Sequence, residues 1–199
     1  DVLGAHAKNC GAVNTLSFSE DGRVYGESTD GVGLITDLNN HNITIEDRSV
    51  LVIGAGGTAK SILPSIIEMN PKTITLTNRT KKNAESLRGA FLHLFQIDCI
   101  LGENIDRNYD LVINTTSSQL SNVVPSINSI AVKGADSYDV NYSWEQTLFQ
   151  SWSSDNGSST ALQGWGMLVE QAAESFSIWR GIRPETSDVV DRLQAEVEN

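Results

Sequence analysis

Short apolar runs and amphipathic segments alternate along the middle of the chain. The run SVLVIGAG, residues 49–56, is almost continuously apolar, which is typical of a parallel strand covered on both faces. Residues 73–79 are rich in β-branched side chains, and 110–116 and 134–142 contain two further candidate strands. Because helical patterns lie between these runs, residues 49 to 142 predict a doubly wound parallel sheet of the α/β class.

Two of the helical patterns lie between strands of this sheet. Residues 58–70 predict a helix in which Pro64 has to stand near the first turn or kink the axis. Residues 81–95 predict a second helix, whose apolar stripe consists of Ala84, Leu87 and Phe91.

Other patterns flank this central region. Residues 12–28 predict a β-hairpin around an Asp-Gly turn. Residues 29–40 predict a helix whose first N–H groups are capped by the side chain of Thr29 or Asp30. Residues 151–160 are polar and rich in serine, which predicts a loop.

Two further helices are predicted toward the C-terminus. Residues 165–181 are strongly periodic and end at Gly181, and residues 185–198 form an amphipathic segment. One face of the first helix is expected to carry Met167, Ala172 or Ala173, Phe176 and Trp179.

A glycine-rich stretch stands where the first strand of the sheet should turn into a helix. Gly54 allows a tight turn, Gly56 lets a ligand approach the backbone, and Ala59 is small enough for close packing of helix on strand. The first N–H groups of the helix would then face a pyrophosphate. The alternative is a tight turn with no ligand.

Basic residues follow the second strand. A carboxylate that holds the ribose 2′-hydroxyl of NAD is expected about 20 residues after the glycines, but the sequence there is TNRTKKN. Arg79, Lys81 and Lys82 would attract a 2′-phosphate, so the pattern favours NADP over NAD. The alternative is that the lysines only coat the start of a helix, where they oppose its dipole.

Composition narrows the class of protein. The net charge of −11 over 199 residues argues against a nucleic-acid or membrane binder, because both need a positive face. Cys10 and Cys99 match no metal-binding spacing and suit a reducing cytoplasm. No apolar run approaches the roughly 18 residues of a membrane span, so we expect a cytoplasmic protein without a metal. The three histidines, which share no motif with a nucleophile, are expected at surface or packing positions: His6, His41 and His93.

Several motifs occur in the order found in shikimate dehydrogenases, and the chain resembles that family over nearly its whole length. They are GAVNTL (11–16), TDGVGL (29–34), VLVIGAGGTAKSI (50–62), TNRT (77–80), DLVINTTSS (110–118), YDVNY (138–142) and GMLVEQAAESFSIWRG (166–181). The resemblance implies reversible reduction of 3-dehydroshikimate to shikimate with NADPH, on the route to chorismate and aromatic amino acids. It also implies a monomer or homodimer that takes a small-molecule substrate.

The resemblance also implies roles for individual residues. The substrate ligands are Asn14, Asp30, Tyr142 and Gln171, of which Asp30 is also catalytic. The cofactor ligands are Gly54, Ala55, Gly56, Gly57 and Thr58 at the pyrophosphate, Asn78, Arg79, Thr80, Lys81 and Lys82 at the adenosine phosphate, and Val140 and Gly164 at the nicotinamide. Without the resemblance, the simpler interpretations are that Asn14 is a hairpin residue, Asp30 a helix cap and Gln171 an interior residue with local hydrogen bonds.

Family members carry an upstream segment that supplies a catalytic lysine as the partner of Asp30, and this chain has no lysine in the matching motif. We therefore expect it to bind NADP with little dehydrogenase activity. The expected organisation is a remnant of the substrate domain at 1–29, a Rossmann-like NADP-binding domain at 30–163 and returning helices at 164–199.

Three departures from the family pattern leave room for other functions. Ser28, Asn83 and Gln163 replace a usual Asn, a basic residue and a usual Asp, and they blur the choice between shikimate and quinate. The alternatives are a quinate or aminoshikimate dehydrogenase and a non-catalytic NADP-binding module.

Overall fold

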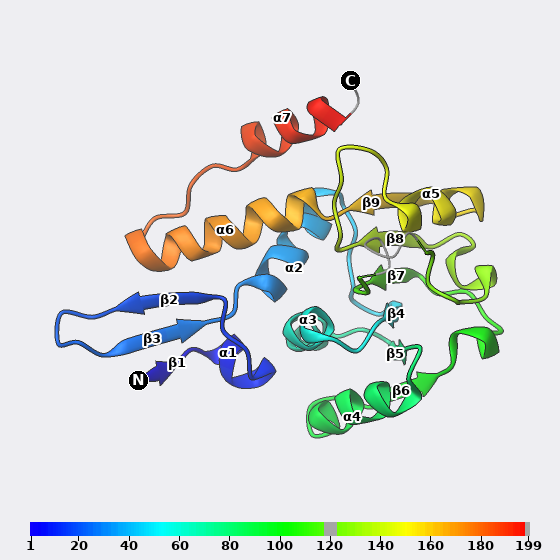
Figure 1. Ribbon diagram of the computed structural model, residues 1–199, viewed down its shortest axis with the longest axis horizontal. Coiled ribbons are helices and arrows are strands. Elements are labelled where there is room, and N and C mark those ends of the chain that lie inside the picture. Colours follow the sequence, from blue (N-terminus) through cyan, green and yellow to red (C-terminus); the bar gives the residue numbers. More distant parts are fainter. Residues whose placement is uncertain (118–122, 198–199) are drawn as a thin grey trace.

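The computed structural model describes residues 1–117 and 123–197, and it contains two β-sheets connected by helices (Figure 1). Two predicted segments extend beyond the described residues, because the motif at 110–118 and the helix at 185–198 each end one residue outside them. In the described part, no helix is both long and apolar enough to cross a membrane.

The larger sheet has six parallel strands and confirms the doubly wound architecture. Its strands follow the order β6-β5-β4-β7-β8-β9, in which the order reverses between β4 and β7. Their bounds are β4 Ser49–Ile53, β5 Thr73–Thr77, β6 Ile97–Ile100, β7 Leu111–Asn114, β8 Asp136–Asp139 and β9 Thr160–Gln163.

Both faces of the central strand are covered, which accounts for its continuous apolar sequence. Val50 and Val52 pack into a cluster with helices α2 (Asp30–Asn40), α3 (Gly57–Glu68) and α4 (Lys81–Phe91). The alternate residues of the same strand, Leu51 and Ile53, pack on the opposite face with η3 (Ser129–Val132) and α5 (Leu148–Asp155). The buried stripe of α4 is as predicted, since Ala84, Leu87 and Phe91 are all buried.

The structure corrects the prediction for residues 151–160. Helix α5 continues to Asp155, and Thr160 already belongs to strand β9, so only the residues between them form a loop. Thr147 caps the helix by accepting a hydrogen bond from the Gln150 N–H, and Phe149 buries its face against the sheet. Pro64 lies well inside α3 and is buried there, so it is not near the first turn.

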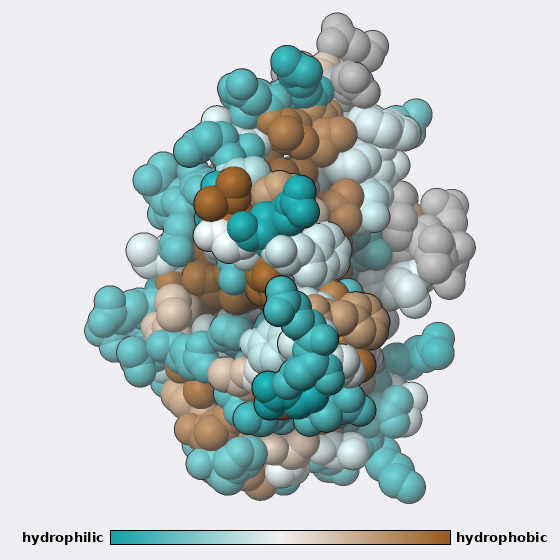
Figure 2. Space-filling model, turned by 90° about the vertical axis from the view of Figure 1, so that its left-hand side faces the viewer, coloured by the Kyte–Doolittle hydropathy of each residue, from teal (hydrophilic) through white to brown (hydrophobic). Residues whose placement is uncertain are grey.

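A smaller sheet holds the predicted hairpin, in the order β1-β3-β2. Its antiparallel pair is β2 (Thr15–Phe18) and β3 (Val24–Glu27), and β1 (Val2–Leu3) adds a parallel strand followed by helix α1 (Ala5–Cys10). Apolar side chains remain exposed on this sheet, notably Phe18, which is 75% exposed. Figure 2 shows hydrophobic residues interspersed with hydrophilic ones on the side of the molecule where the hairpin lies.

Helix α6 (Trp165–Arg180) packs along α2 and links the two sheets, and α7 (Ser187–Val197) follows it (Figure 1). Gly33 permits this close approach, because a Cβ there would lie 2.9 Å from the backbone N of Gln171. The predicted apolar face of α6 is only partly right. Met167 and Ala173 are buried, but Phe176 and Trp179 are exposed. Trp179 lies toward the hairpin, where its indole N–H donates to the Leu16 carbonyl.

Candidate functional site

The glycine-rich turn lies at the carboxyl end of β4, beside the point where the strand order reverses. Gly54 has φ +112°, a conformation that L side chains rarely adopt, and a Cβ there would collide with Thr115. Among residues 1–117 and 123–197, no heavy atom lies within 4 Å of a Cβ built on Gly56 or Gly57, which open helix α3. Within the same residues no side chain caps this helix start, so its N–H groups suit an anion that approaches from solvent.

A pocket of about 440 Å³ adjoins this turn. Ala55, Gly56 and Gly57 form one side of it, and Asn83, Ser86 and Leu87 of α4 form another. Lys60, from the first turns of α3, also lines it and adds a positive charge beside the exposed N–H groups. The open backbone, the cation and the room therefore fit a phosphate-bearing dinucleotide.

The predicted basic cluster lies at the start of α4, directly after β5. Asn78 donates its side-chain N–H to the Thr80 carbonyl over 2.9 Å, which shapes the turn that carries Arg79. Lys81 and Lys82 occupy the first turn of α4, which contains no acidic residue. Lys81 is partly neutralised by Glu85, whose carboxylate lies 3.6 Å away. An exposed pair of this kind contributes little, so the lysine remains available to an anion.

A buried carboxylate organises the carboxyl ends of β7 and β8. Asp139 accepts hydrogen bonds from Asn114 Nδ2 at 3.0 Å, Asn141 Nδ2 at 2.7 Å and Thr147 Oγ1 at 2.7 Å. Burial raises the pKa of Asp139, and the hydrogen bonds from Thr147 and Asn141 act in the opposite direction. This network fixes the start of the loop that follows β8.

Val140 and Gly164, the predicted nicotinamide ligands, are brought together at this edge. A Cβ on Gly164 would lie 2.8 Å from the Val140 carbonyl carbon, so only glycine fits there. The two residues follow adjacent parallel strands, β8 and β9. They therefore lie at the carboxyl edge of the sheet, where ligands bind in open α/β folds.

Asn14, Asp30 and Gln171, three of the predicted substrate ligands, are brought together from the hairpin, α2 and α6. Asn14 Nδ2 donates to Asp30 Oδ1 at 2.7 Å. The hydroxyl oxygen of Thr29 lies 3.2 Å from Asn14 Oδ1 and 3.3 Å from Gln171 Oε1, and its single hydrogen can be donated to either acceptor. Thr29 stands at the N-cap of α2 but its side chain makes no cap hydrogen bond, which corrects that half of the prediction, and the alternative cap, Asp30, is the first residue of the helix itself.

Sequence reasoning missed the hydroxyls beneath this cluster. Ser175 Oγ lies 2.6 Å from Thr15 Oγ1 and 3.2 Å from Thr29 Oγ1, and all three residues are buried. Ser175 stands one helical turn after Gln171 and donates to its carbonyl at 3.0 Å. That spacing is the signal that could have pointed to Ser175, whereas its contacts with the hairpin depend on tertiary packing.

Tyr142, the remaining predicted substrate ligand, lies in a different place. The residue is 44% exposed, and its ring packs against Trp165 with 4.6 Å between ring centroids. This ring contact connects Tyr142 with the start of α6, one residue after Gly164.

One histidine takes part in a buried polar group outside this site. His41 Nδ1 lies 3.3 Å from Asp37 Oδ1, and Tyr138 donates its phenol O–H to Asp37 Oδ2 over 2.5 Å. The hydrogen bond to Asp37 raises the pKa of His41, although burial acts in the opposite direction. This group ties α2 to β8. Across the described ranges no set of three or more His, Cys, Asp or Glu side chains is placed to hold a metal ion.

Comparison with known proteins gives consistent matches. Residues 37–136 match the family model described as shikimate / quinate 5-dehydrogenase, and residues 164–194 match the shikimate 5′-dehydrogenase C-terminal domain. The shikimate dehydrogenase (NADP(+)) of Hydrogenovibrio crunogenus is 43% identical, over 98% of this chain and 71% of the relative. That of Psychromonas ingrahamii is 39% identical, over 96% and 71%.

Solved structures show the same fold. The Ael1 enzyme from Pseudomonas putida has a TM-score of 0.88 and 32% identity, covering 97% of this chain and 72% of its own. Shikimate dehydrogenase from Aquifex aeolicus has a TM-score of 0.83 and 29% identity, covering 97% and 70%.

Proposed function

The chain belongs to the shikimate dehydrogenase family, and we propose that it supplies the NADP site and part of the substrate site of an enzyme that interconverts 3-dehydroshikimate and shikimate. The observation that carries this proposal is the polar cluster of Asn14, Asp30 and Gln171, assembled from three separate segments. Short, fixed donors and acceptors of this kind suit a ring that bears several hydroxyls.

The open start of α3 supports the cofactor part of the proposal. Its exposed N–H groups would hold the pyrophosphate between Gly54 and Thr58, and residues 78 to 82 would hold the 2′-phosphate. Val140 and Gly164 would contact the nicotinamide. When bound, NADPH supplies the hydride for reduction of the ring carbonyl.

The chain's own residues would orient the substrate and handle the proton. Asn14 and Gln171 would bind ring hydroxyls, and Asp30, fixed by Asn14, would act at the oxygen that gains or loses a proton. Tyr142 would border the ring from the nicotinamide side. In family members a lysine shares the proton transfer, and these 199 residues contain none in the matching motif. We therefore propose that the chain alone binds NADP but turns over little shikimate.

A second candidate is a dehydrogenase for a related polyhydroxylated ketone or alcohol, such as quinate. Ser28 and Gln163 depart from the family pattern, and Gln163 contacts the loop that carries Tyr142, since its Oε1 accepts the Ser143 N–H at 2.9 Å. A 5-ketofructose reductase of Gluconobacter has the same fold, with a TM-score of 0.82 and 26% identity, so this fold also serves another substrate.

A chimera tests the function. The N-terminal segment of the Hydrogenovibrio crunogenus relative would be fused before Asp1, and oxidation of shikimate and of quinate would be followed by NADPH absorbance. Shikimate turnover by the chimera, its loss in Asp30→Asn and near-absence in the isolated chain are expected. Turnover of quinate in preference to shikimate would select the second candidate, and no turnover of either by a chimera that binds NADP would contradict both.

A further inference from the structure

The loop after β8, residues Val140–Trp144, is held by the junction between β9 and α6. Gly164 N–H donates to the Asn141 carbonyl at 2.9 Å. Gln163 Oε1 accepts the Ser143 N–H at 2.9 Å, and Trp165 Nε1 donates to the Ser143 carbonyl at 3.1 Å. Three consecutive residues thus bind both polar backbone groups of Ser143 and one of Asn141.

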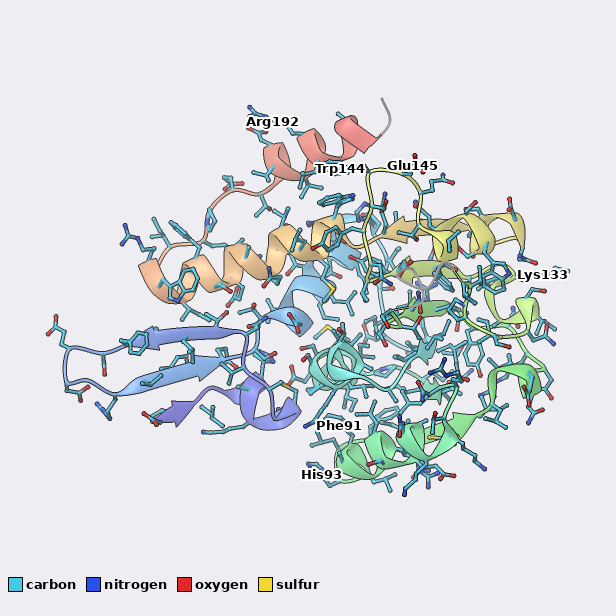
Figure 3. The ribbon with its side chains drawn as sticks, in the orientation of Figure 1. Phe91, His93, Lys133, Trp144, Glu145 and Arg192 are labelled. Carbon is cyan, nitrogen blue, oxygen red and sulfur yellow. The ribbon has the colours of Figure 1, made fainter. Side chains whose placement is uncertain are left out.

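Aromatic packing reinforces this contact. The buried ring of Trp165 lies between two rings of the loop, with centroid distances of 4.6 Å to Tyr142 and 4.8 Å to Trp144. Figure 3 shows Trp144 on the loop beside α6, whereas the neighbouring Glu145 projects away from it. Tilted aromatic pairs at these separations add to the stabilisation of the loop beyond simple burial.

The loop also connects the two parts of the site. Its first residue, Val140, packs on Gly164, and Tyr142 stands two residues later. Helix α6 begins at Trp165 and carries Gln171 less than two turns further on. One junction therefore sets the positions of the loop and of the helix that holds a substrate ligand.

We propose that Gln163 and Trp165 are positioning residues for the nicotinamide end of the cofactor site. The inference rests on the proposed NADP-binding function. They act through Ser143, by fixing the backbone that places Val140 and Tyr142. The adenosine end is built from β5, α3 and α4, whereas Ser143 follows β8, which lies on the other side of β4 in the sheet. Disturbing the junction should consequently weaken contacts with the nicotinamide and spare those with the 2′-phosphate.

Two ligands separate these ends in a binding experiment with the 199-residue chain. NADPH spans the whole site, whereas adenosine 2′,5′-bisphosphate occupies only the adenosine end. Trp165→Phe replaces the indole by a smaller aromatic ring and removes the N–H donor, and Gln163→Leu removes the acceptor. Each substitution should lower the affinity for NADPH by roughly threefold to tenfold, which is the effect of losing about one hydrogen bond. The affinity for the bisphosphate should stay unchanged.

Matched controls guard against a general loss of structure. Gln163→Glu retains an oxygen acceptor and should bind NADPH like the parent chain. Trp152→Phe removes an indole on α5 that packs on Phe149, away from the loop, and should change neither affinity. Thermal unfolding of each variant would confirm that it folds.

The outcomes distinguish this inference from the proposed function. Equal affinity of parent and variants for NADPH, or equal weakening of both ligands in a folded variant, would overturn the positioning role. Failure of the parent chain to bind either ligand would instead count against the proposed function.

Discussion

Asn14 donates its side-chain N–H to Asp30 Oδ1 over 2.7 Å, so a hairpin residue fixes the carboxylate that opens helix α2. The side-chain amide oxygen of Asn14, Oδ1, also makes a hydrogen bond, because it accepts the backbone N–H of Thr29 at 3.0 Å. A side chain held at both ends needs no reorganisation to orient Asp30, which is what a preorganised catalytic group requires.

Replacing Asn14 should impair catalysis more than stability. In the active chimera, Asn14→Leu should lower kcat/KM for shikimate by about 100-fold, since a substrate hydroxyl and Asp30 would both lose a partner. Steady-state kinetics measure this, and Asn9→Ala on the exposed face of α1 is the control. If kcat/KM of Asn14→Leu matches that of the control, Asn14 neither binds the substrate nor orients Asp30 for the reaction.

A carboxylate in the glycine turn should weaken cofactor binding without unfolding the chain. Gly57→Asp has room for its side chain, and an acidic group is favourable at a helix start, but it would repel the pyrophosphate. The NADP affinity should fall by about tenfold or more. Gly89→Asp in α4 also has open space and serves as the control. Unchanged NADP affinity in Gly57→Asp would place the pyrophosphate elsewhere.

The basic cluster should discriminate between the two dinucleotides. Arg79→Ala should lower the affinity for NADP by roughly tenfold and leave the affinity for NAD unchanged. Only NADP carries the 2′-phosphate, which a guanidinium can bind through two oxygens. Calorimetry with both dinucleotides measures the difference, and Arg192→Ala on α7 is the control. A parallel loss for both would mean that Arg79 acts on something other than the 2′-phosphate.

The stability of the chain should carry a signature of His41 that depends on pH. Asp37 raises the pKa of His41 above its ordinary value of 6.5, so its contribution is fully present below that value. The contribution is lost as pH rises through the higher pKa of the folded state. His41→Gln should therefore cost up to about 1 kcal/mol near pH 5.5 and almost nothing near pH 9.

Urea unfolding at these two pH values measures the difference between His41→Gln and the parent chain. His93→Gln, beyond the end of α4, is the control (Figure 3). A cost of His41→Gln that does not change with pH would show that the ring contributes by packing alone.

The sequence indicated the centre of the fold better than its edges. Strand β4 is buried on both faces, and the glycines after it suit a tight turn. The sequence pattern therefore predicts both the strand and the turn correctly. Strand β9 is only half-buried. The serines of α5 predict a loop, although Thr147 caps this helix and Phe149 is buried against the sheet. Local pattern carries little information where packing against the rest of the sheet decides the structure.

The candidate site divides in the same way. The glycine turn and the cations after β5 follow from short-range chemistry, and family motifs pointed to Asn14, Asp30 and Gln171. The contact between the hydroxyl of Thr29 and Gln171 brings together two residues that are 142 positions apart, which no local spacing reveals. The hold of Gln163 and Trp165 on Ser143 likewise exists only once β8 and β9 lie side by side.

The central claim is that this chain carries an NADP site at the start of α3, with the 2′-phosphate held by the cations after β5. Isothermal titration of the 199-residue chain with NADP and with NAD tests it most directly. We expect uptake of one NADP per chain with an affinity at least about tenfold above that for NAD, equivalent to about 1.4 kcal/mol. Equal affinities for the two dinucleotides, or no uptake of either, would contradict it.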